Sequence, residues 1–420
     1  MRLELASFPV TGLVFADGRG DPGYRDGVLT VDRAALLARL RADARIADVD
    51  VDIARPGEAV RILSIHDLIE PRLKVEGPGD VFPGVAKRPL VAVGQGRTHC
   101  LAGMAVAECA PLTAFGGAPG WHEGPAFYLD MRGPAALRPF AELSLLCVRA
   151  TPRDDLAAVE RAEAAWDAAL HAALHVAALT RDATPERLER LETPPAAAHL
   201  PRVVYLPLYT SPEHYGGSAH AFGTSIYGLT RLTPPQWFHG NEYMDGAVAR
   251  CGTWVHQHQT QVLDLLRAHG KSVCFAGVIA QRTRWTSEPQ KRWTAQQTAR
   301  LAKTLGAAGA LVTWDFGGND FLEVAYTVEA CEALGIRTVF MTVEQERPGN
   351  PGSFLFMPPS ADAIVSTGGL TVTEAPPPQR VIGCEDAHMT GHAVTAGGRI
   401  RPIFGEYDFY GLRYRGRLDF

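Results

Sequence analysis

The second half of this chain alternates apolar runs with amphipathic segments, and this alternation restricts its fold more than any other feature. Runs typical of buried strands occur at 203–208, 272–280, 310–314, 337–343 and 363–366, and amphipathic helices are predicted at 259–269, 293–305 and 321–334. A glycine follows each predicted helix, which is typical of a helix end. Apolar strands that alternate with helices predict a parallel, doubly wound, Rossmann-like sheet.

The first 150 residues follow a different pattern, in which short β-like runs are separated by glycine and proline. The runs are 27–31, 47–53, 60–65 and 90–93, and one helix is predicted at 33–43 with Asp32 as its N-cap. A long Ala-rich helix follows at 155–179, and a Pro/Ala linker at 193–196. We therefore predict an α/β protein with a β-rich N-terminal domain at 1–150, a helix and linker at 151–200, and a Rossmann-like domain with a C-terminal extension at 201–420.

Charge and cysteine content argue against several classes of protein. The net charge is −5 and there is no basic block, so neither nucleic acid nor membrane is predicted as a partner. The N-terminal residues MRLELASFPV do not read as a secretory signal, and no apolar run has the length of a membrane span. Seven scattered cysteines indicate a reducing compartment and not a disulfide framework, so the expected location is the cytoplasm.

Polar residues follow one predicted strand of the second half. In parallel sheets ligands bind beyond the carboxyl ends of the strands, and the turn at 315–320 follows the strand at 310–314. Asn319 and Asp320 are therefore candidate substrate-binding residues. Gly94-Gln95-Gly96 lacks the third glycine of a dinucleotide-binding fingerprint, so no nucleotide cofactor is predicted there.

Several segments in both halves resemble those of one known family. They are RLELASFPV, DVDVDIARPGEAVRILSIHDLIEPRLKVEG, VGQGRTHCLAGMAV, EYMDGAVA, CGTWVHQHQ, RAHGKSVCFAGVI and FGGND. In these segments the chain resembles the component B precursors of the glycine, sarcosine, betaine and D-proline reductases. The resemblance implies an oxidoreductase subunit of amino-acid catabolism that cleaves a bond at the α-carbon of a small amino-acid-derived substrate. It also implies a partner reductase subunit, or assembly with copies of the same chain.

The resemblance implies a reactive centre as well. Precursors of this family cleave themselves on the N-terminal side of a cysteine, which becomes an electrophilic pyruvoyl group. Cys251 is the only cysteine in the matching neighbourhood, and here Arg250 precedes it where the glycine reductase precursors have asparagine and a longer loop. Because the chain has no selenocysteine, any selenol that attacks the substrate must come from another chain.

Three further residues in the family-like segments are candidate site residues. Arg97 is a candidate catalytic residue and carboxylate clamp because its guanidinium matches a carboxylate in a bidentate way, and His99 is a second candidate catalytic residue. Asp245 is a candidate substrate-binding residue in EYMDGAVA. The alternative for Arg97 is a structural ion pair with an acidic residue between the domains.

A rival chemistry is available at the same place. Cys251, His256 and His258 form C-x4-H-x-H, and on an extended backbone the two histidines would point to the same face. A thiolate and two imidazoles are good zinc ligands, so the alternative function is a metal-dependent hydrolase or lyase. Additional ligands or acid/base groups could come from a C-terminal cluster that contains Cys384, His388 and His392. The alternatives left open are that both histidines are polar loop residues, and that the chain is a non-catalytic partner in a complex.

Overall fold

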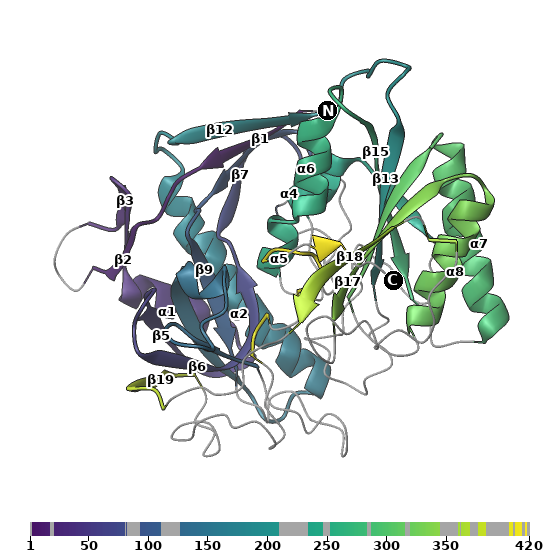
Figure 1. Ribbon diagram of the computed structural model, residues 1–420. Helices are drawn as coiled ribbons and strands as arrows, with labels where there is room; N and C mark the ends of the chain where they lie inside the picture. The colour runs from purple at the N-terminus through teal and green to yellow at the C-terminus, as the bar shows by residue number, and fades with distance from the viewer. Residues whose placement is uncertain are drawn as a thin grey trace.

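The computed structural model describes residues 2–16, 21–79, 81, 93–110, 127–209, 234–246, 253–283, 287–315, 320–344, 360–361, 363–369, 377–383, 403–405, 408–413 and 416–417. These residues form four β-sheets and the helices that pack on them (Figure 1). The α/β class is thereby confirmed. None of the helices in these ranges is long and apolar enough to cross a membrane.

Three sheets are built mainly from the first 192 residues. The six-stranded sheet contains β10 (Phe127–Asp130), β6 (Val60–Ile69), β9 (Met104–Cys109), β11 (Ser144–Pro152) and β5 (Ile46–Ala54) in this order, with β19 (Arg380–Ile382) paired to β6. The four-stranded sheet has the order β12 (Arg187–Glu192), β1 (Arg2–Ser7), β8 (Gly96–Cys100) and β7 (Arg72–Glu76). The third sheet contains β2 (Gly12–Phe15), β4 (Val28–Val31) and β3 (Gly23–Arg25).

Within its described residues, this half also contains two helices and two short 3₁₀ turns. The helices are α1 (Arg33–Arg41) and α2 (Ala158–Ala177), and the turns are η2 (Phe140–Glu142) and η3 (Ala178–Thr180). Asp32 caps α1 as predicted, because its carboxylate accepts a hydrogen bond from the Ala35 backbone N–H at 2.9 Å. Trp166, Leu170 and Val176 of α2 are buried in one core with residues of β9 and β11. Each such buried side chain contributes about 1.5–3 kcal/mol to stability.

The seven-stranded sheet belongs to the second half of the chain. Its order is β14 (Gln236–Phe238), β15 (Cys274–Arg282), β13 (Arg202–Tyr209), β16 (Gly309–Trp314), β17 (Arg337–Glu344), β18 (Ala363–Gly369) and β20 (Gly416–Arg417). The five strands from β15 to β18 are parallel, and the two edge strands are antiparallel. When the five parallel strands are numbered by their order in the chain, their spatial order in the sheet is 2-1-3-4-5, which is the flavodoxin-like order. The Rossmann-like assignment is therefore not confirmed, because its strand order is 3-2-1-4-5-6.

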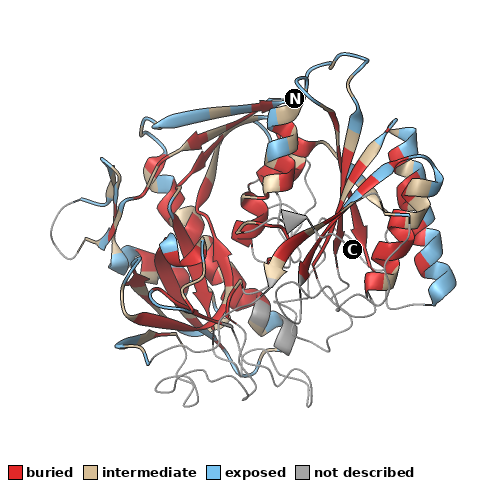
Figure 2. Ribbon diagram, in the orientation of Figure 1, coloured by how far each residue is buried: buried red, intermediate tan, exposed pale blue. Residues whose placement is uncertain are grey.

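Helices cover both faces of this sheet. One face carries α7 (Glu288–Thr304) and α8 (Asp320–Ala333), and the other carries α4 (Gly240–Gly246) and α6 (Thr260–Ala268). The predicted helices at 259–269, 293–305 and 321–334 are thus present. The helix α7 starts five residues before its predicted beginning because Pro289 is tolerated in a first turn. Figure 2 shows that the inner strands are mostly buried and that exposed residues lie on the outer sides of α7 and α8.

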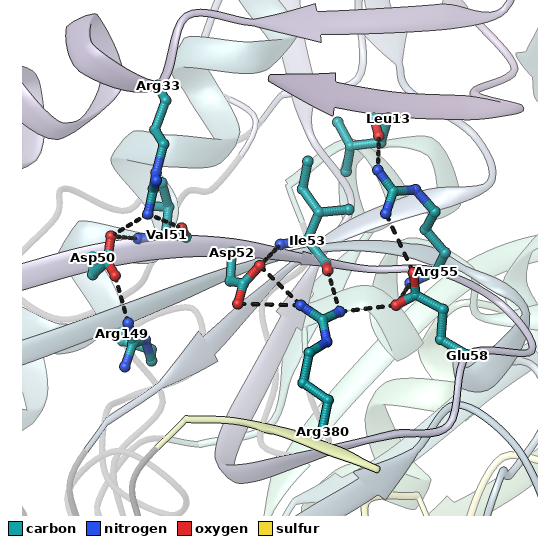
Figure 3. A network of polar contacts seen from close by, with 10 residues as sticks. All are labelled: Leu13, Arg33, Asp50, Val51, Asp52, Ile53, Arg55, Glu58, Arg149 and Arg380. Atoms are coloured by element: carbon teal, nitrogen blue, oxygen red, sulfur yellow. Dashed lines mark hydrogen bonds and ion pairs between the residues drawn. The ribbon is translucent and has the colours of Figure 1, made fainter. Parts of the chain in front are cut away.

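Two features of the first half were not anticipated. The segment expected to hold only a helix and linker also contains β12, whose charged sequence RLERLE suits an exposed edge strand. In addition, residues 377–383 return to the first half, where β19 joins β6 and Arg380 binds Asp52 at 3.2 Å and Glu58 at 2.9 Å (Figure 3). The C-terminal part of the chain therefore packs on both halves.

Candidate functional site

The segment 247–252, which includes Cys251, lies outside the described residues. The helix α4 ends just before it and α5 (Thr253–Gln257) begins just after it. Figure 1 places both helices between the sheets of the first half and the seven-stranded sheet. The position of Cys251 along the chain is thus bounded on both sides by helices at the junction of the two halves.

Asp67 of β6 holds the beginning of α5. Its carboxylate accepts hydrogen bonds from the Thr253 backbone N–H at 2.7 Å and the Thr253 hydroxyl at 2.6 Å. The Trp166 indole N–H donates to the same carboxylate at 3.0 Å. All three residues are buried. An anionic acceptor at a helix N-terminus satisfies backbone N–H groups that lack intrahelical partners, so Asp67 fixes the backbone two residues after Cys251.

Glu70 and Arg72 hold the other end of α5. The Glu70 carboxylate binds the His258 ring at 2.7 Å and the Arg72 guanidinium at 2.8 Å. Arg72 also donates to the Gln257 carbonyl at 2.9 Å, and the Gln257 amide exchanges two hydrogen bonds with the Glu70 backbone. Burial opposes ionisation of Glu70, but His258 and Arg72 outweigh it and lower the pKa of this carboxyl to about 2. Glu70 and Arg72 therefore form a buried ion pair in which both groups make further hydrogen bonds.

Asp245 holds the end of α4 on the four-stranded sheet. Its carboxylate is fully buried, pairs with Lys74 and accepts hydrogen bonds from the Thr98 hydroxyl at 2.6 Å and the Gly94 N–H at 3.2 Å. Gly94 has φ +109°, and a Cβ added there would lie 2.8 Å from the backbone nitrogen of Glu242. Gly94 is therefore required for close approach of two backbones. We call the contacts of Asp67, Glu70 and Asp245 with α4 and α5 the helix clamp.

His256 points from α5 toward the seven-stranded sheet. It is fully buried, and burial lowers the pKa of its imidazole to about 3, so the ring is neutral at pH 7. The Tyr243 hydroxyl lies 3.3 Å from its Nδ1, and the rings of Tyr209 and Tyr410 lie 5.6 Å and 5.5 Å from it. Its Nε2 has no hydrogen-bond partner among the described residues. In a neutral imidazole this nitrogen can donate or accept a hydrogen bond, depending on the tautomer, and is therefore able to bind a polar ligand.

The expected shared face of the two histidines is wrong. Residues 253–257 are helical and not extended, and residues two apart on a helix do not face each other. His258 stacks on Trp254 at 4.0 Å and binds Glu70, whereas His256 contacts Tyr243. In the part of the chain that the structure describes, no three His, Cys, Asp or Glu side chains are grouped to hold a metal ion.

Arg97 and His99 lie beside the clamp and not in it. Arg97 makes two hydrogen bonds to the Glu4 carboxylate, at 2.7 Å and 3.0 Å, and with burial opposing it this contact lowers the pKa of Glu4 to about 2. His99 is buried against Thr180, 3.1 Å from its hydroxyl, and burial lowers its pKa. Side chains alternate along a strand, so Thr98 reaches Asp245 while its two neighbours point to the opposite face.

The remaining predicted residues receive little structural description. Asn319 and the cluster at Cys384, His388 and His392 lie outside the described residues, and Asp320 is described only as the first residue of α8. Their roles stay predictions.

Of the residues that make the clamp, Asp245 is a candidate from the sequence, whereas Asp67, Glu70 and Arg72 are not, although a signal for them is present. Asp67, Glu70 and Arg72 follow the predicted strand at 60–65 and interrupt an otherwise apolar stretch. Charged residues in a buried strand need buried partners. That rule marks them as members of a polar network, but it does not identify those partners.

Fold and site together define an α/β protein in which two anchored helices, α4 and α5, flank a short cysteine-containing segment of the chain. The chain matches the model of the glycine/sarcosine/betaine reductase component B subunits over residues 1–402, and it belongs to this family. It is 33% identical to the glycine reductase complex component B subunits alpha and beta of Peptoclostridium acidaminophilum, over 91% of this chain and 89% of that protein.

Two other relatives come from the same organism. The sarcosine reductase complex component B subunit alpha is 32% identical, over 92% of this chain and 90% of the relative. The betaine reductase complex component B subunit alpha is 29% identical, over 91% and 88%. No solved structure matches the chain significantly.

Proposed function

We propose that this chain is the substrate-binding subunit of a reductase complex and that it cleaves a bond at the α-carbon of a small amino-acid-derived substrate with a centre built on Cys251. Family membership supports the reductase class, because the relatives are named as component B subunits of glycine, sarcosine and betaine reductase complexes. A partner chain completes the complex in this proposal, since the chain itself contains no selenocysteine.

The helix clamp is the observation that carries the proposal. Asp245 anchors the helix that precedes the segment 247–252 in the chain, Asp67 anchors the helix that follows it, and both carboxylates are buried. Buried charged contacts are costly unless they are fully satisfied. We infer that such anchors on the flanking helices serve to position a reactive group between them, because a reactive group needs a rigid support.

In this proposal, a hydrogen-bonding side chain of α5 complements a carbonyl group. A pyruvoyl group derived from Cys251 would supply an electrophilic carbonyl that binds an amino substrate and withdraws electrons from its α-carbon. His256 would face that group from α5 as a neutral hydrogen-bonding ring, because its pKa of about 3 keeps it uncharged and its Nε2 is unpartnered within the described residues. Asp67 would keep α5, and with it His256, in position.

The zinc alternative is not favoured. It required His256 and His258 to share a face, and the helical backbone of α5 separates them. His258 is already bound to the Glu70 carboxylate at 2.7 Å.

Denaturing electrophoresis of purified protein tests the proposal. A working centre gives two fragments, split between Arg250 and Cys251, and hydrazine or borohydride labels the C-terminal fragment. The matched control is Cys251→Ala, which removes the sulfur and cannot form the group. A single unlabelled chain in the wild-type protein after prolonged incubation of native extract would rule the proposed centre out.

A further inference from the structure

Polar residues lie at the carboxyl ends of three neighbouring strands of the seven-stranded sheet: Tyr209 ends β13, Arg282 ends β15, and Asp315 directly follows β16. Tyr209 of β13 pairs in register with Arg282 of β15. On the other side of β13, Leu208 pairs with Trp314 of β16, so the next residues are Tyr209 and Asp315. Side chains in register on adjacent strands point to the same face. We call Arg282, Tyr209 and Asp315 the strand-end row.

The row faces the helix clamp. The Tyr209 ring lies 5.6 Å from the His256 ring of α5. Alternation along β13 agrees with this direction, because Tyr205, four residues earlier, accepts a hydrogen bond from Gln259, which precedes α6, at 2.7 Å. The row is therefore on the side of the sheet that carries α4 and α6, next to the helix that follows Cys251.

The row also lies where α/β sheets bind ligands. Its central strand, β13, comes first in the chain, and the strands that follow it pair on opposite sides, β15 on one and β16 on the other. Such a reversal of strand order opens a crevice at the carboxyl ends of the strands. The row occupies those ends.

Two buried polar atoms at this place have no hydrogen-bond partner among the described residues. Both side chains are fully buried, and neither the Tyr209 hydroxyl nor the His256 Nε2 has a hydrogen-bond partner in the described part of the chain. Buried polar groups in native proteins are nearly always hydrogen-bonded. Two adjacent exceptions beside a buried guanidinium and a buried carboxylate indicate a place for a polar ligand.

We propose that the strand-end row is the recognition subsite for a small zwitterionic amino acid, a proposal that rests on the proposed function. Arg282 binds the carboxylate, because a guanidinium offers paired donors in the geometry of that group. Asp315, on the opposite side of Tyr209, faces the cationic nitrogen. The Tyr209 hydroxyl and His256 Nε2 hydrogen-bond the ligand between them. Arg97, the earlier candidate for the carboxylate clamp, is instead bound to Glu4.

Titration calorimetry with glycine, sarcosine and betaine as probes tests this subsite, with acetate and methylamine as half-ligands that carry one charge each. The background is Cys251→Ala, so that binding is measured without the proposed reactive group. One of the three zwitterions is expected to bind, and more tightly than acetate or methylamine. Arg282→Gln should weaken it by about ten- to a hundredfold, which is typical for loss of a charge-assisted hydrogen-bond pair.

Tyr209→Phe is the second variant, because it removes only the unpartnered hydroxyl. It should weaken binding several-fold without lowering the thermal unfolding midpoint, whereas a hydroxyl with a structural partner would lower it on removal. Arg153→Gln, in an exposed ion pair with Asp155, is the matched arginine control and should bind like the parent. If Arg282→Gln does not fold, the affinities of Tyr209→Phe and Asp315→Asn for the zwitterion test the subsite in its place.

Binding that is equal in the parent, Arg282→Gln and Tyr209→Phe overturns the subsite, and so does failure of all three zwitterions to bind. The two proposals fail separately. If the chain is uncleaved and unlabelled but binds a zwitterion through Arg282, the subsite is supported and the Cys251 centre is ruled out. If the chain is cleaved and reacts with hydrazine but Arg282→Gln does not change binding, the Cys251 centre is supported and the subsite is ruled out.

Discussion

The His258 ring nitrogen Nε2 lies 2.7 Å from a carboxylate oxygen of Glu70, a residue 188 positions earlier in the chain. This contact joins the end of α5 to the strands of the first half. Glu70 is fully buried, and its carboxylate also forms an ion pair with the Arg72 guanidinium. Stability should therefore depend on the charge of Glu70.

Glu70→Gln tests this dependence. A pKa lowered from 4.5 to about 2 in the folded state stabilises the protein above pH 4.5, and the contribution is lost as pH falls through 4.5 toward 2. At 1.36 kcal/mol per unit, the variant should lose about 3 kcal/mol at pH 7. Urea denaturation at pH 7, 5 and 3.5 should show the difference from wild type shrinking at the lowest pH. Glu142→Gln, in an exposed pair with Arg138, is the control, and a difference that does not change with pH would contradict the assignment.

Asp67→Asn should loosen the start of α5. The substitution replaces an anionic acceptor of three hydrogen bonds by a neutral amide, so we expect a loss of about 1–3 kcal/mol and a change in Trp166 fluorescence. Thr253→Val removes only the hydroxyl donor and should lose less. The yield of fragments cut before Cys251 should fall in the same order. Equal fragment yields in all three proteins would show that the clamp does not position Cys251.

Gly94→Ala should displace α4. The added Cβ meets the Glu242 backbone at 2.8 Å, and φ is +109°. Gly57 is a matched control, since its φ is +79° but nothing lies within 4 Å of an added Cβ. Gly57→Ala should lower the free energy of unfolding by about 1–2 kcal/mol from backbone strain alone. Gly94→Ala should lower it further and should reduce the yield of fragments cleaved before Cys251. Thermal unfolding of both variants makes the comparison, and similar midpoints would mean that α4 does not need this close approach.

Limited proteolysis tests the proposed domain boundaries at 150 and 200. Residues 193–199 have no regular structure and are mostly exposed, so elastase, which cuts after small residues, should cut first at Ala196–Ala198. Fragment masses by mass spectrometry identify the site. Early cutting within 270–345 with 193–199 intact would contradict the boundary.

The sequence by itself determined most of the secondary structure of the second half. The apolar runs at 203–208, 310–314 and 337–343 became β13, β16 and β17, and the three predicted helices became α6, α7 and α8. Periodicity succeeds here because it reports how one segment divides its own residues between core and water. The family was also readable from the sequence, because several of its segments survive in both halves.

Only the tertiary structure decided which polar residues meet. His256 and His258 were assigned a common face on an extended backbone, and the short helix α5 separated them, because its beginning is fixed by Asp67 of a distant strand. The row of Arg282, Tyr209 and Asp315 exists only because β13 lies between β15 and β16. Local pattern cannot give strand order or a hydrogen bond between residues 186 positions apart, such as Asp67 and Thr253. Both depend on how separate segments pack against each other and are excluded from water together.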